Sequence, residues 1–467
     1  MIKELHKKLI EKHVTSRQLT EEAFVRIEKN KLNSFITLTP EMAFKQADDV
    51  DKDIASGKEI DLLAGIPMSV KDVFMVKDVR ATGGSKMLEN YIAPYTATAI
   101  QKLFDNGAVC LGKTNCDEFA MGSTTENSAF GPTLNPWDHE RVPGGTSGGS
   151  AAAVAALEGF YSIGSDTGGS VRQPAAFCGV IGFKPTYGAI SRYGLIATAS
   201  SLDTVGILAQ SVEDAEYIFK VMKGKDSLDS TSEDFSFEKL PIKKIGIIQE
   251  YFPKKYSSKE VFINFDFIKS QITKFKNLLK CGKDNENVIE ISLPSLNHAL
   301  ASYYIINYAE ISSNLARLDG MRYGENHLEV ENLLHQYLSN RSLFGAEAKR
   351  RIMLGTHILS AGYYGAYYKK AQSVREMIVK DFKKAFEKVD ILVGPVTVTT
   401  AYKFGEKAAN PLEMYLGDIY TVAANLAKVP AMSVPIGFNF ETGMPIGIQL
   451  IGKWGQEKAL LDFAKHI

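Results

Sequence analysis

The feature that most constrains the fold is the density of glycine, serine and alanine between Pro143 and Gly206. Within this stretch, Ser150–Glu158 (SAAAVAALE) is rich in good helix formers and predicts a helix. The apolar segments Tyr161–Ile163 and Gly179–Lys184 are short and lie beside glycines, which predicts strands. A chain that alternates short strands with helices in this way is typical of an α/β sheet.

The same alternation extends in both directions along the chain. Pro67–Val73 predicts a strand, Thr98–Asn106 has apolar residues at helical spacing, and residues 108–113 (AVCLGK) predict another strand. Near the C-terminus, Ala431–Phe438 and Met444–Ile451 alternate around a Glu-Thr-Gly turn and predict a hairpin. The chain is therefore expected to have an α/β fold.

We expect residues 1–467 to form a single domain. Residues 1–60 are predicted to be an N-terminal helical segment, in which Thr15 and Gln18 have the spacing of a capping box. Residues from roughly 223 to 385 are predicted to be a largely helical and more variable insertion.

Charge and composition argue against several classes of protein. Lys plus Arg is 54 and Asp plus Glu is 54, whereas a chain that grips a nucleic-acid backbone by itself usually has a basic excess. Any nucleic acid is therefore expected to be held by a partner. The 4 cysteines have no C-x-x-C spacing and no nearby histidines, which favours buried thiols in a reducing compartment over disulfides or a zinc site. Because there is no signal peptide and no apolar run of about 18 residues, we expect a cytoplasmic protein without a membrane span.

The loop Gly144–Ser150 (GGTSGGS) matches two known motifs only in part. Its G-x-S-x-G pattern fits the nucleophile elbow of α/β-hydrolases, but that motif needs a preceding hydrophobic strand, and Asn135–Pro143 does not form one. No histidine lies in a glycine-rich or strand-end context, so a Ser-His-Asp triad is disfavoured. The loop also lacks the Gly-Lys-Ser/Thr of a P-loop, and close packing is the simpler explanation of its glycines.

A second glycine loop runs from Gly164 to Pro174 (GSDTGGSVRQP). Gly168 and Gly169 directly precede Ser170, which leaves the serine hydroxyl exposed and lets successive backbone N–H groups point at one spot. Such a nest stabilises an oxyanion, and each donor contributes about 2.7–4 kcal/mol in acyl transfer. Taken alone, a Gly-Gly-Ser sequence is more often a simple turn.

Lys71 ends the apolar segment Pro67–Lys71, where a charged side chain is costly to bury. Burial lowers the pKa of a lysine, so the neutral amine can accept a proton near pH 7. A strand-end lysine that reaches solvent is the alternative.

Lys71 and the two glycine loops together resemble the amidase signature family. The resemblance implies that Ser170 is a nucleophile whose proton passes to Lys71 through a relay hydroxyl on a cis peptide bond. In that family the relay serine lies 24 residues before the nucleophile, and this position is Thr146 in the present chain. Threonine keeps the hydroxyl, but its methyl group restricts χ1 and crowds the site. The alternatives are a relay through Ser147 and reduced activity.

Longer blocks are similar to the A-subunit family of glutamyl-tRNA(Gln) amidotransferases. These blocks are Asp117–Ser128, Gly164–Tyr187, residues 350–356 and Met414–Asp418. The resemblance implies a mixed β-sheet flanked by helices on both faces and an enzyme that hydrolyses glutamine. It implies a heterotrimer with subunits B and C, in which ammonia, ATP and magnesium are used on the partner to convert Glu-tRNA(Gln) to Gln-tRNA(Gln). This chain itself is expected to hold no cofactor and no metal, and to meet tRNA only through the partner.

The resemblance also assigns roles around the substrate. Backbone N–H groups of Thr167, Gly168 and Gly169 are expected to hold the oxyanion. Arg351 is expected to bind the glutamine carboxylate, for which a guanidinium is geometrically suited, and Asp418 the ammonium.

Three further residues are expected to shape the pocket. Met121 would line it, and either Tyr303 or Tyr304 would close it. In one alternative Arg350 faces the pocket in place of the neighbouring arginine, and in another Asp418 only caps a helix.

Two other functions fit parts of the sequence. A free-standing amidase for small amides would share Lys71 and Ser170, but it would have no use for an arginine and an aspartate that bind substrate charges. A scaffold subunit without activity is suggested by Thr146 alone.

Overall fold

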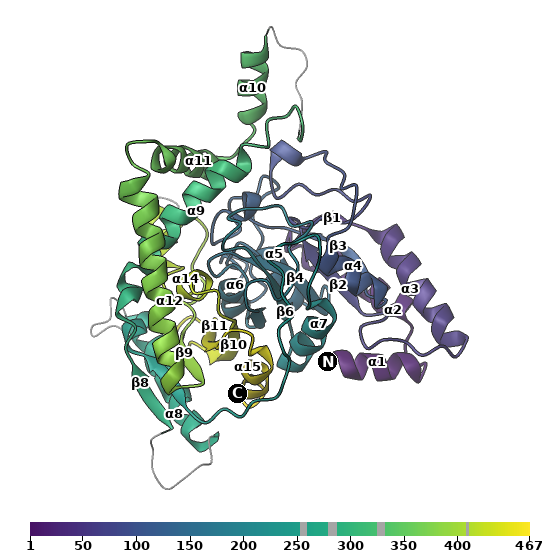
Figure 1. Ribbon diagram of the computed structural model, residues 1–467. Coiled ribbons are helices and arrows are strands. Elements are labelled where there is room, and N and C mark those ends of the chain that lie inside the picture. The colour runs from purple at the N-terminus through teal and green to yellow at the C-terminus, as the bar shows by residue number, and fades with distance from the viewer. Residues whose placement is uncertain (253–258, 279–286, 325–331, 408–410) are drawn as a thin grey trace.

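An 11-stranded mixed β-sheet organises the computed structural model, which describes residues 1–252, 259–278, 287–324, 332–407 and 411–467 (Figure 1). The strands are β1 (Phe35–Leu38), β2 (Pro67–Lys71), β3 (Val109–Thr114), β4 (Tyr161–Asp166), β5 (Ile181–Lys184), β6 (Thr204–Ala209), β7 (Ile245–Ile248), β8 (Val288–Ile291), β9 (Ile391–Pro395), β10 (Ala431–Phe438) and β11 (Pro445–Gly452). Their order across the sheet is β1-β3-β2-β4-β6-β5-β10-β11-β9-β7-β8.

Helices surround this sheet. They are α1 (Ile2–Ile10), α2 (Ser16–Asn30), α3 (Pro40–Ala55), α4 (Thr98–Asp105), α5 (Gly148–Ala155), α6 (Arg172–Cys178), α7 (Val212–Met222), α8 (Lys259–Leu278), α9 (Ala299–Leu315), α10 (Leu333–Arg341), α11 (Ala346–Leu359), α12 (Lys370–Lys388), α13 (Pro411–Leu416), α14 (Val422–Leu426) and α15 (Glu457–Ala464). Single turns of tighter or wider helix are η1 (Lys86–Leu88), η2 (Glu118–Ala120), η3 (Gln249–Tyr251), η4 (Pro294–His298) and η5 (Gly365–Lys369).

Parallel and antiparallel pairs occur in the same sheet. Strand β2 runs parallel to both β3 and β4, and β7 runs parallel to β8 and β9. Strands β10 and β11 form an antiparallel hairpin in which Ala431 lies opposite Ile451, which confirms the predicted hairpin. The strands predicted around β2, β3, β4 and β5 are also present.

Strand β6 shows that helices cover both faces of the sheet. Val205 and Ile207 belong to the apolar cluster that includes side chains of α4 and α7. Leu208 belongs instead to a cluster formed with α5 and α6. Because successive side chains of a strand point to opposite faces, these helices lie on opposite sides of the sheet. The expected mixed sheet with helices on both faces is confirmed.

The N-terminal segment and the central region both contain strands as well as helices. Thr15 caps α2, since its Oγ1 accepts the Gln18 N–H at 3.0 Å and Gln18 Oε1 accepts the Thr15 N–H at 2.9 Å, which confirms the predicted capping box. Strand β1, within residues 1–60, pairs with β3. Strands β7 and β8, within residues 223–385, extend the sheet at its opposite edge.

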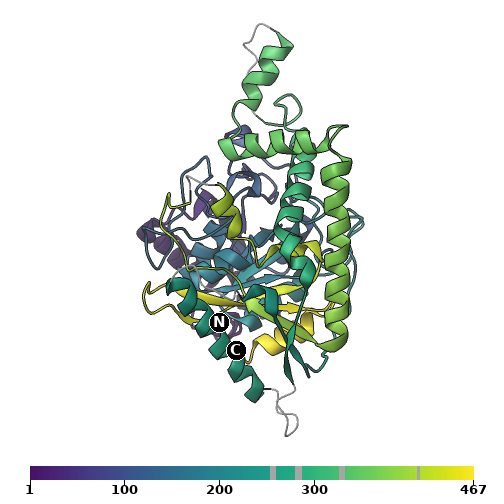
Figure 2. The same cartoon turned by 90° about the vertical axis from the view of Figure 1, so that its left-hand side faces the viewer.

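A layer of helices packs on the part of the sheet formed by β7 to β11. Helix α9 packs against α11, α12 and α14, and α11 and α12 meet at one corner of the molecule (Figures 1 and 2). Helix α10 projects from the rest of the body in both views. The tyrosines of α9 contribute to an apolar cluster that also contains side chains of α12 and α14.

No helix in the ranges given above combines the length and hydrophobicity needed to cross a bilayer. Cys110, Cys116 and Cys178 are free and buried, whereas Cys281 lies outside the described residues.

Candidate active site

Lys71 is the last residue of β2, and its side chain is fully buried. Met68 and Val70 belong to the main apolar core, so Ser69 and Lys71 point to the opposite face of the sheet. Burial lowers the pKa of Lys71 to about 8, because the ammonium form loses its hydration. The lysine does not reach solvent, so the alternative of a solvent-exposed lysine at the end of the strand is wrong.

Thr146 lies in the loop before α5, and its peptide bond to Gly145 is cis. Lys71 Nζ donates to Thr146 Oγ1 at 2.6 Å and to Ser165 Oγ at 2.9 Å. The hydroxyl of Ser147 donates instead to the Ser165 carbonyl oxygen at 3.2 Å. The structure thus brings the Thr146 hydroxyl to the lysine, and it gives Ser147 a different partner.

Ser170 lies in the second glycine loop, between β4 and α6. It is partly exposed, whereas residues 161–169 before it are buried. The Ser147 N–H donates to the Ser170 carbonyl oxygen at 3.1 Å, so the two glycine loops are joined next to Thr146. The Ser170 side chain therefore lies where a substrate can reach it.

A buried ion pair fixes the backbone around Ser170. The Asp166 carboxylate accepts the N–H of Gly169 at 2.9 Å and that of Val171 at 3.2 Å. It also accepts two hydrogen bonds of 3.0 Å from the Arg172 guanidinium, and both side chains are fully buried. Burial alone would raise the pKa of Asp166, but the adjacent guanidinium holds it well below its usual value.

The amides predicted to hold an oxyanion differ in their contacts. The Gly169 N–H donates to the buried carboxylate just described, so it is already engaged in this structure. The Thr167 hydroxyl donates to Asp203 Oδ1 at 2.7 Å, and the Thr421 hydroxyl donates to the Gly168 carbonyl oxygen at 2.6 Å. These two contacts hold the loop in place, and the role of the Thr167 and Gly168 amides stays a prediction.

The two tyrosines named for closing the pocket have separate positions on α9. Tyr303 lies against the glycine loop, and a side chain on Gly168 would collide with its ring. The Tyr304 hydroxyl donates to Asp418 Oδ2 at 2.7 Å. Burial raises the pKa of Asp418 to about 7, because the ionised carboxylate loses its hydration. Tyr303 is therefore the one that covers the loop, and Tyr304 orients Asp418.

The Arg351 side chain, on α11, is 4% exposed, whereas the Arg350 side chain is 42% exposed. Arg351 Nε donates to Glu347 Oε1 at 2.7 Å, and its Nη1 donates to Asn307 Oδ1 at 3.1 Å. Burial opposes the charged form of Arg351, but Glu347 and the surrounding tyrosines together outweigh it and raise the pKa of the guanidinium. Of the two arginines, Arg351 is the one that faces inward.

Aromatic rings surround the Arg351 guanidinium. Its carbon lies 5.7–5.8 Å from the ring centroids of Tyr304, Tyr308 and Tyr415. Because Tyr304 also contacts Asp418, one ring links the cationic and the anionic group. A molecule that carries a carboxylate and an ammonium close together fits such a pair.

Met121 is fully buried in an apolar cluster with Phe119, Ile311 and Phe344. Ile311 belongs to α9, so the methionine packs beside the helix that bears the two tyrosines. Its contact with a substrate stays a prediction.

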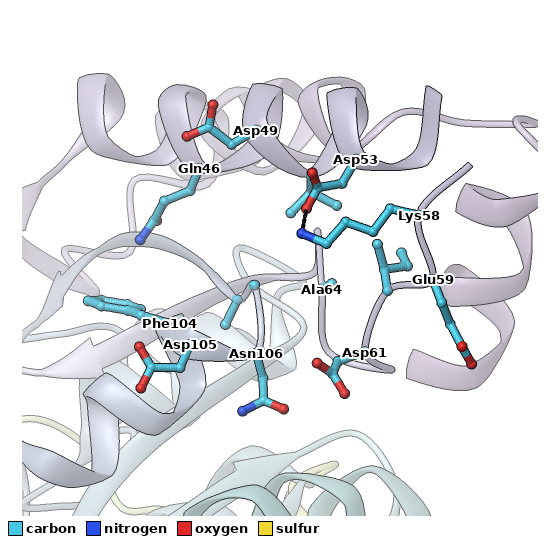
Figure 3. A pocket seen from close by; sticks show the side chains of 14 residues that line it. Gln46, Asp49, Asp53, Lys58, Glu59, Asp61, Ala64, Phe104, Asp105 and Asn106 are labelled. Carbon is cyan, nitrogen blue, oxygen red and sulfur yellow. Dashed lines mark hydrogen bonds and ion pairs between the residues drawn. The ribbon is translucent and has the colours of Figure 1, made fainter. Parts of the chain in front are cut away.

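A cavity lies beside Glu347, the ion-pair partner of Arg351. This cavity, of about 340 Å³, is lined by Glu347, Gly345 and Glu118, among other residues. Figure 3 shows a different cavity, of about 300 Å³, which lies between α3 and α4 and is lined by Asp49 and by the ion pair of Lys58 with Asp53. This second cavity shares no residue with the candidate site.

The chemistry available at the site is that of acyl transfer. It has a partly exposed serine, a hydroxyl bonded to a buried amine, and an inward-facing arginine and aspartate. Within the described ranges, no group of three or more His, Cys, Asp and Glu side chains is arranged to hold a metal ion.

The family model described as Amidase matches residues 18–461. The A subunit of the glutamyl-tRNA(Gln) amidotransferase of Nostoc sp. (strain PCC 7120) is 50% identical over 99% of this chain and 96% of its own length. The chain belongs to the amidase family, and within it to the family of these A subunits. The corresponding subunit of Carboxydothermus hydrogenoformans is also 50% identical, over 99% of this chain and 95% of its own.

Solved amidase structures share the fold. The A subunit of the glutamyl-tRNA(Gln) amidotransferase from Thermotoga maritima has a TM-score of 0.76 at 35% identity, over 96% of this chain and 90% of its own. The peptide amidase from Stenotrophomonas maltophilia has a TM-score of 0.80 at 27% identity, over 99% of this chain and 95% of its own. The resemblance inferred from the sequence is confirmed, and this member of the amidase family is an enzyme subunit.

Several residues that organise this amidase site were not given roles from the sequence. Ser165 is a second partner of Lys71, and Asp166 and Arg172 fix the nucleophile loop. A signal was present for these three, since they lie close to Ser170 in the same glycine-rich block. No comparable signal marked Asn307, whose contact with α11 depends on the packing of two helices.

Proposed function

We propose that this amidase hydrolyses glutamine, with Ser170 as nucleophile and with Thr146 and Lys71 as its proton relay. The observation that supports this most is the 2.6 Å hydrogen bond between Lys71 Nζ and Thr146 Oγ1, next to the Ser170 loop. Because the pKa of Lys71 is lowered to about 8, part of the population carries a neutral amine near pH 7. That amine can accept a proton and later return it.

In the first half-reaction, Ser170 Oγ attacks the carbonyl carbon of the glutamine side-chain amide. The serine proton passes to Thr146 Oγ1, and the proton of Thr146 passes to Nζ of Lys71. Backbone N–H groups of the glycine loop, those of Thr167 and Gly168 among them, donate to the developing oxyanion. When the C–N bond breaks, the relay delivers the proton to the leaving nitrogen, and ammonia departs from a glutamyl ester.

In the second half-reaction, water replaces the serine. The same relay takes a proton from water, whose oxygen attacks the ester carbonyl carbon. The bond to Ser170 Oγ breaks and the serine regains its proton, so glutamate leaves and the enzyme returns to its starting state.

Substrate recognition follows from the two charges of glutamine. Arg351 binds the α-carboxylate, and Asp418, oriented by Tyr304, binds the α-ammonium. An ammonium beside Asp418 favours its ionised form, because an opposite charge lowers a carboxyl pKa. Met121 lines the pocket, and Tyr303 covers the loop that binds the reacting carbonyl.

The released ammonia is used on partner subunits. Relatives at 50% identity are A subunits of glutamyl-tRNA(Gln) amidotransferases, which supports a heterotrimer of this chain with subunits B and C. In this proposal the partner binds ATP, magnesium and the tRNA, and this chain holds no cofactor. The zero net charge fits a subunit that does not grip tRNA by itself. Because aminoacyl-tRNA is used in translation, we infer a cytoplasmic location.

Ammonia release from L-glutamine tests the proposal. The purified chain is assayed alone and with subunits B and C, as wild type, Ser170→Ala and Lys71→Ala. The expected result is release that the partners stimulate and that both substitutions abolish. Turnover of simple aliphatic amides without any turnover of glutamine would instead indicate a free-standing amidase.

A further inference from the structure

We propose that Asn307 is a further glutamine-binding residue, whose side-chain amide nitrogen donates to the α-carboxylate of the substrate. This inference rests on the proposed glutaminase function and adds a second donor beside Arg351. Asn307 lies on α9, one helical turn after Tyr303, and the residue is 1% exposed.

The first observation is an unpaired donor. Asn307 Oδ1 accepts from Arg351 Nη1 at 3.1 Å, but Asn307 Nδ2 has no hydrogen-bond partner among the described residues. A guanidinium only donates, so the asparagine oxygen has to face Arg351 and its NH₂ group points elsewhere. Buried polar groups in folded proteins nearly always have partners, so an unpaired buried NH₂ group calls for a ligand or another explanation.

The second observation is the position of Asn307 along α9. Residues four apart on a helix lie on the same face, so Asn307 follows Tyr303, which contacts the Gly168 loop. Four residues of helix rise by about 6 Å. An extended glutamine spans about 5 Å from its side-chain amide carbon to its carboxylate carbon, from bond lengths near 1.5 Å. If a glutamine with its amide at Gly168 runs parallel to α9, its carboxylate reaches the level of Asn307.

The third observation is the charge around Arg351. Its guanidinium is already paired with Glu347 at 2.7 Å, and Tyr415 also donates to Glu347, at 3.1 Å. The glutamine carboxylate thus approaches an arginine whose charge is partly offset. A neutral donor next to the arginine strengthens carboxylate binding without a second buried cation, which would be costly to desolvate.

The test compares Asn307→Asp and Asn307→Leu with a matched exposed control, Asn297→Asp. Asn297 lies in the turn before the same helix and donates to the Pro294 carbonyl oxygen at 3.3 Å. Each substitution is made in a Ser170→Ala background, so that ligands bind without turnover. Affinities for L-glutamine and for L-glutamine methyl ester are measured by calorimetry on the full chain with subunits B and C.

We expect both Asn307 variants to bind L-glutamine about 10- to 100-fold more weakly, the range set by one hydrogen bond to a charged group. The methyl ester lacks the carboxylate charge, so its affinity is expected to change little. In the active Ser170 background, KM for glutamine rises while kcat changes little. Asn307→Asp keeps an acceptor for Arg351 but places a negative charge at the carboxylate, so it separates direct binding from mere positioning of the arginine.

Two results would overturn the inference. One is unchanged glutamine affinity in Asn307→Asp, and the other is an equal loss for glutamine and ester with a lowered Tm, which indicates a structural role. Failure of the glutaminase proposal looks different, because the chain with an intact Asn307 then neither binds glutamine nor releases ammonia from it. In that case both proposals fall together.

Discussion

Lys71 Nζ and Thr146 Oγ1 are 2.6 Å apart, although one residue ends a strand and the other lies in a loop before a helix. We predict that Thr146→Ser keeps most of the activity, because the hydroxyl remains. We expect Thr146→Val, which has the same shape without the hydroxyl, to lower kcat by about 10²–10⁴-fold, the range for general acid–base catalysis. Ammonia release from glutamine measures both variants.

The neighbouring serine is the matched control for this prediction. Ser147→Ala removes a hydrogen bond to the Ser165 carbonyl oxygen, not one to Lys71, so we expect a smaller loss. If Ser147→Ala removed activity while Thr146→Val left it unchanged, the relay would run through Ser147.

The lowered pKa of Lys71 predicts the direction of the pH dependence. The base form is the neutral amine, so kcat/KM for glutamine should rise with pH below about 8 and level off above it. Below that pKa, each decrease of one pH unit lowers the fraction of neutral Lys71 about tenfold. A profile that stays flat from about pH 6 to about pH 9 would contradict a base at Lys71.

Asp418 is predicted to act on substrate binding more than on the chemical step. Asp418→Asn removes the charge that meets the glutamine ammonium, and we expect KM to rise by about tenfold or more with a smaller change in kcat. Because burial raises the pKa of the free carboxyl to about 7, glutamine binding should also weaken as the pH falls through that value. Tyr304→Phe serves as the milder control, since it removes only the hydroxyl that orients Asp418.

The buried pair of Asp166 and Arg172 is predicted to affect stability. Arg172→Met leaves a buried carboxylate without its cation, and we expect the free energy of unfolding to fall by about 3–5 kcal/mol. A thermal melt followed by circular dichroism measures the change in Tm. Arg17→Met, which breaks an exposed ion pair with Asp48, is expected to leave Tm nearly unchanged.

Much of this fold follows from local patterns, and some of it does not. The hairpin of β10 and β11 and the cap at Thr15 rest on interactions between residues near in sequence, and both could be predicted. Strands β7 and β8 have only 4 residues each and lie in a region dominated by helices. Their strand form depends on pairing with distant parts of the sheet, which a local pattern does not encode.

The candidate site could likewise be predicted only in part from the sequence. The resemblance to the amidase signature family indicated Thr146 as the relay residue, and the structure gives this hydroxyl, and not that of Ser147, to Lys71. The sequence could not distinguish Tyr303 from Tyr304, because adjacent helical residues point about 100° apart and the orientation of α9 is set by tertiary packing. For the same reason Asn307 could not be connected with α11.

Helices α9 and α11 supply Tyr303, Asn307 and Arg351, whereas Lys71 and Ser170 come from the end of a strand and the loop that follows another. In the proposed function, the groups that break the bond and the groups that recognise the substrate thus lie on separate segments of the chain. A descendant of such an enzyme can exchange one amide for another through mutations in these helices and in the turn that carries Asp418. The bond-breaking apparatus would pass unchanged from the old substrate to the new one.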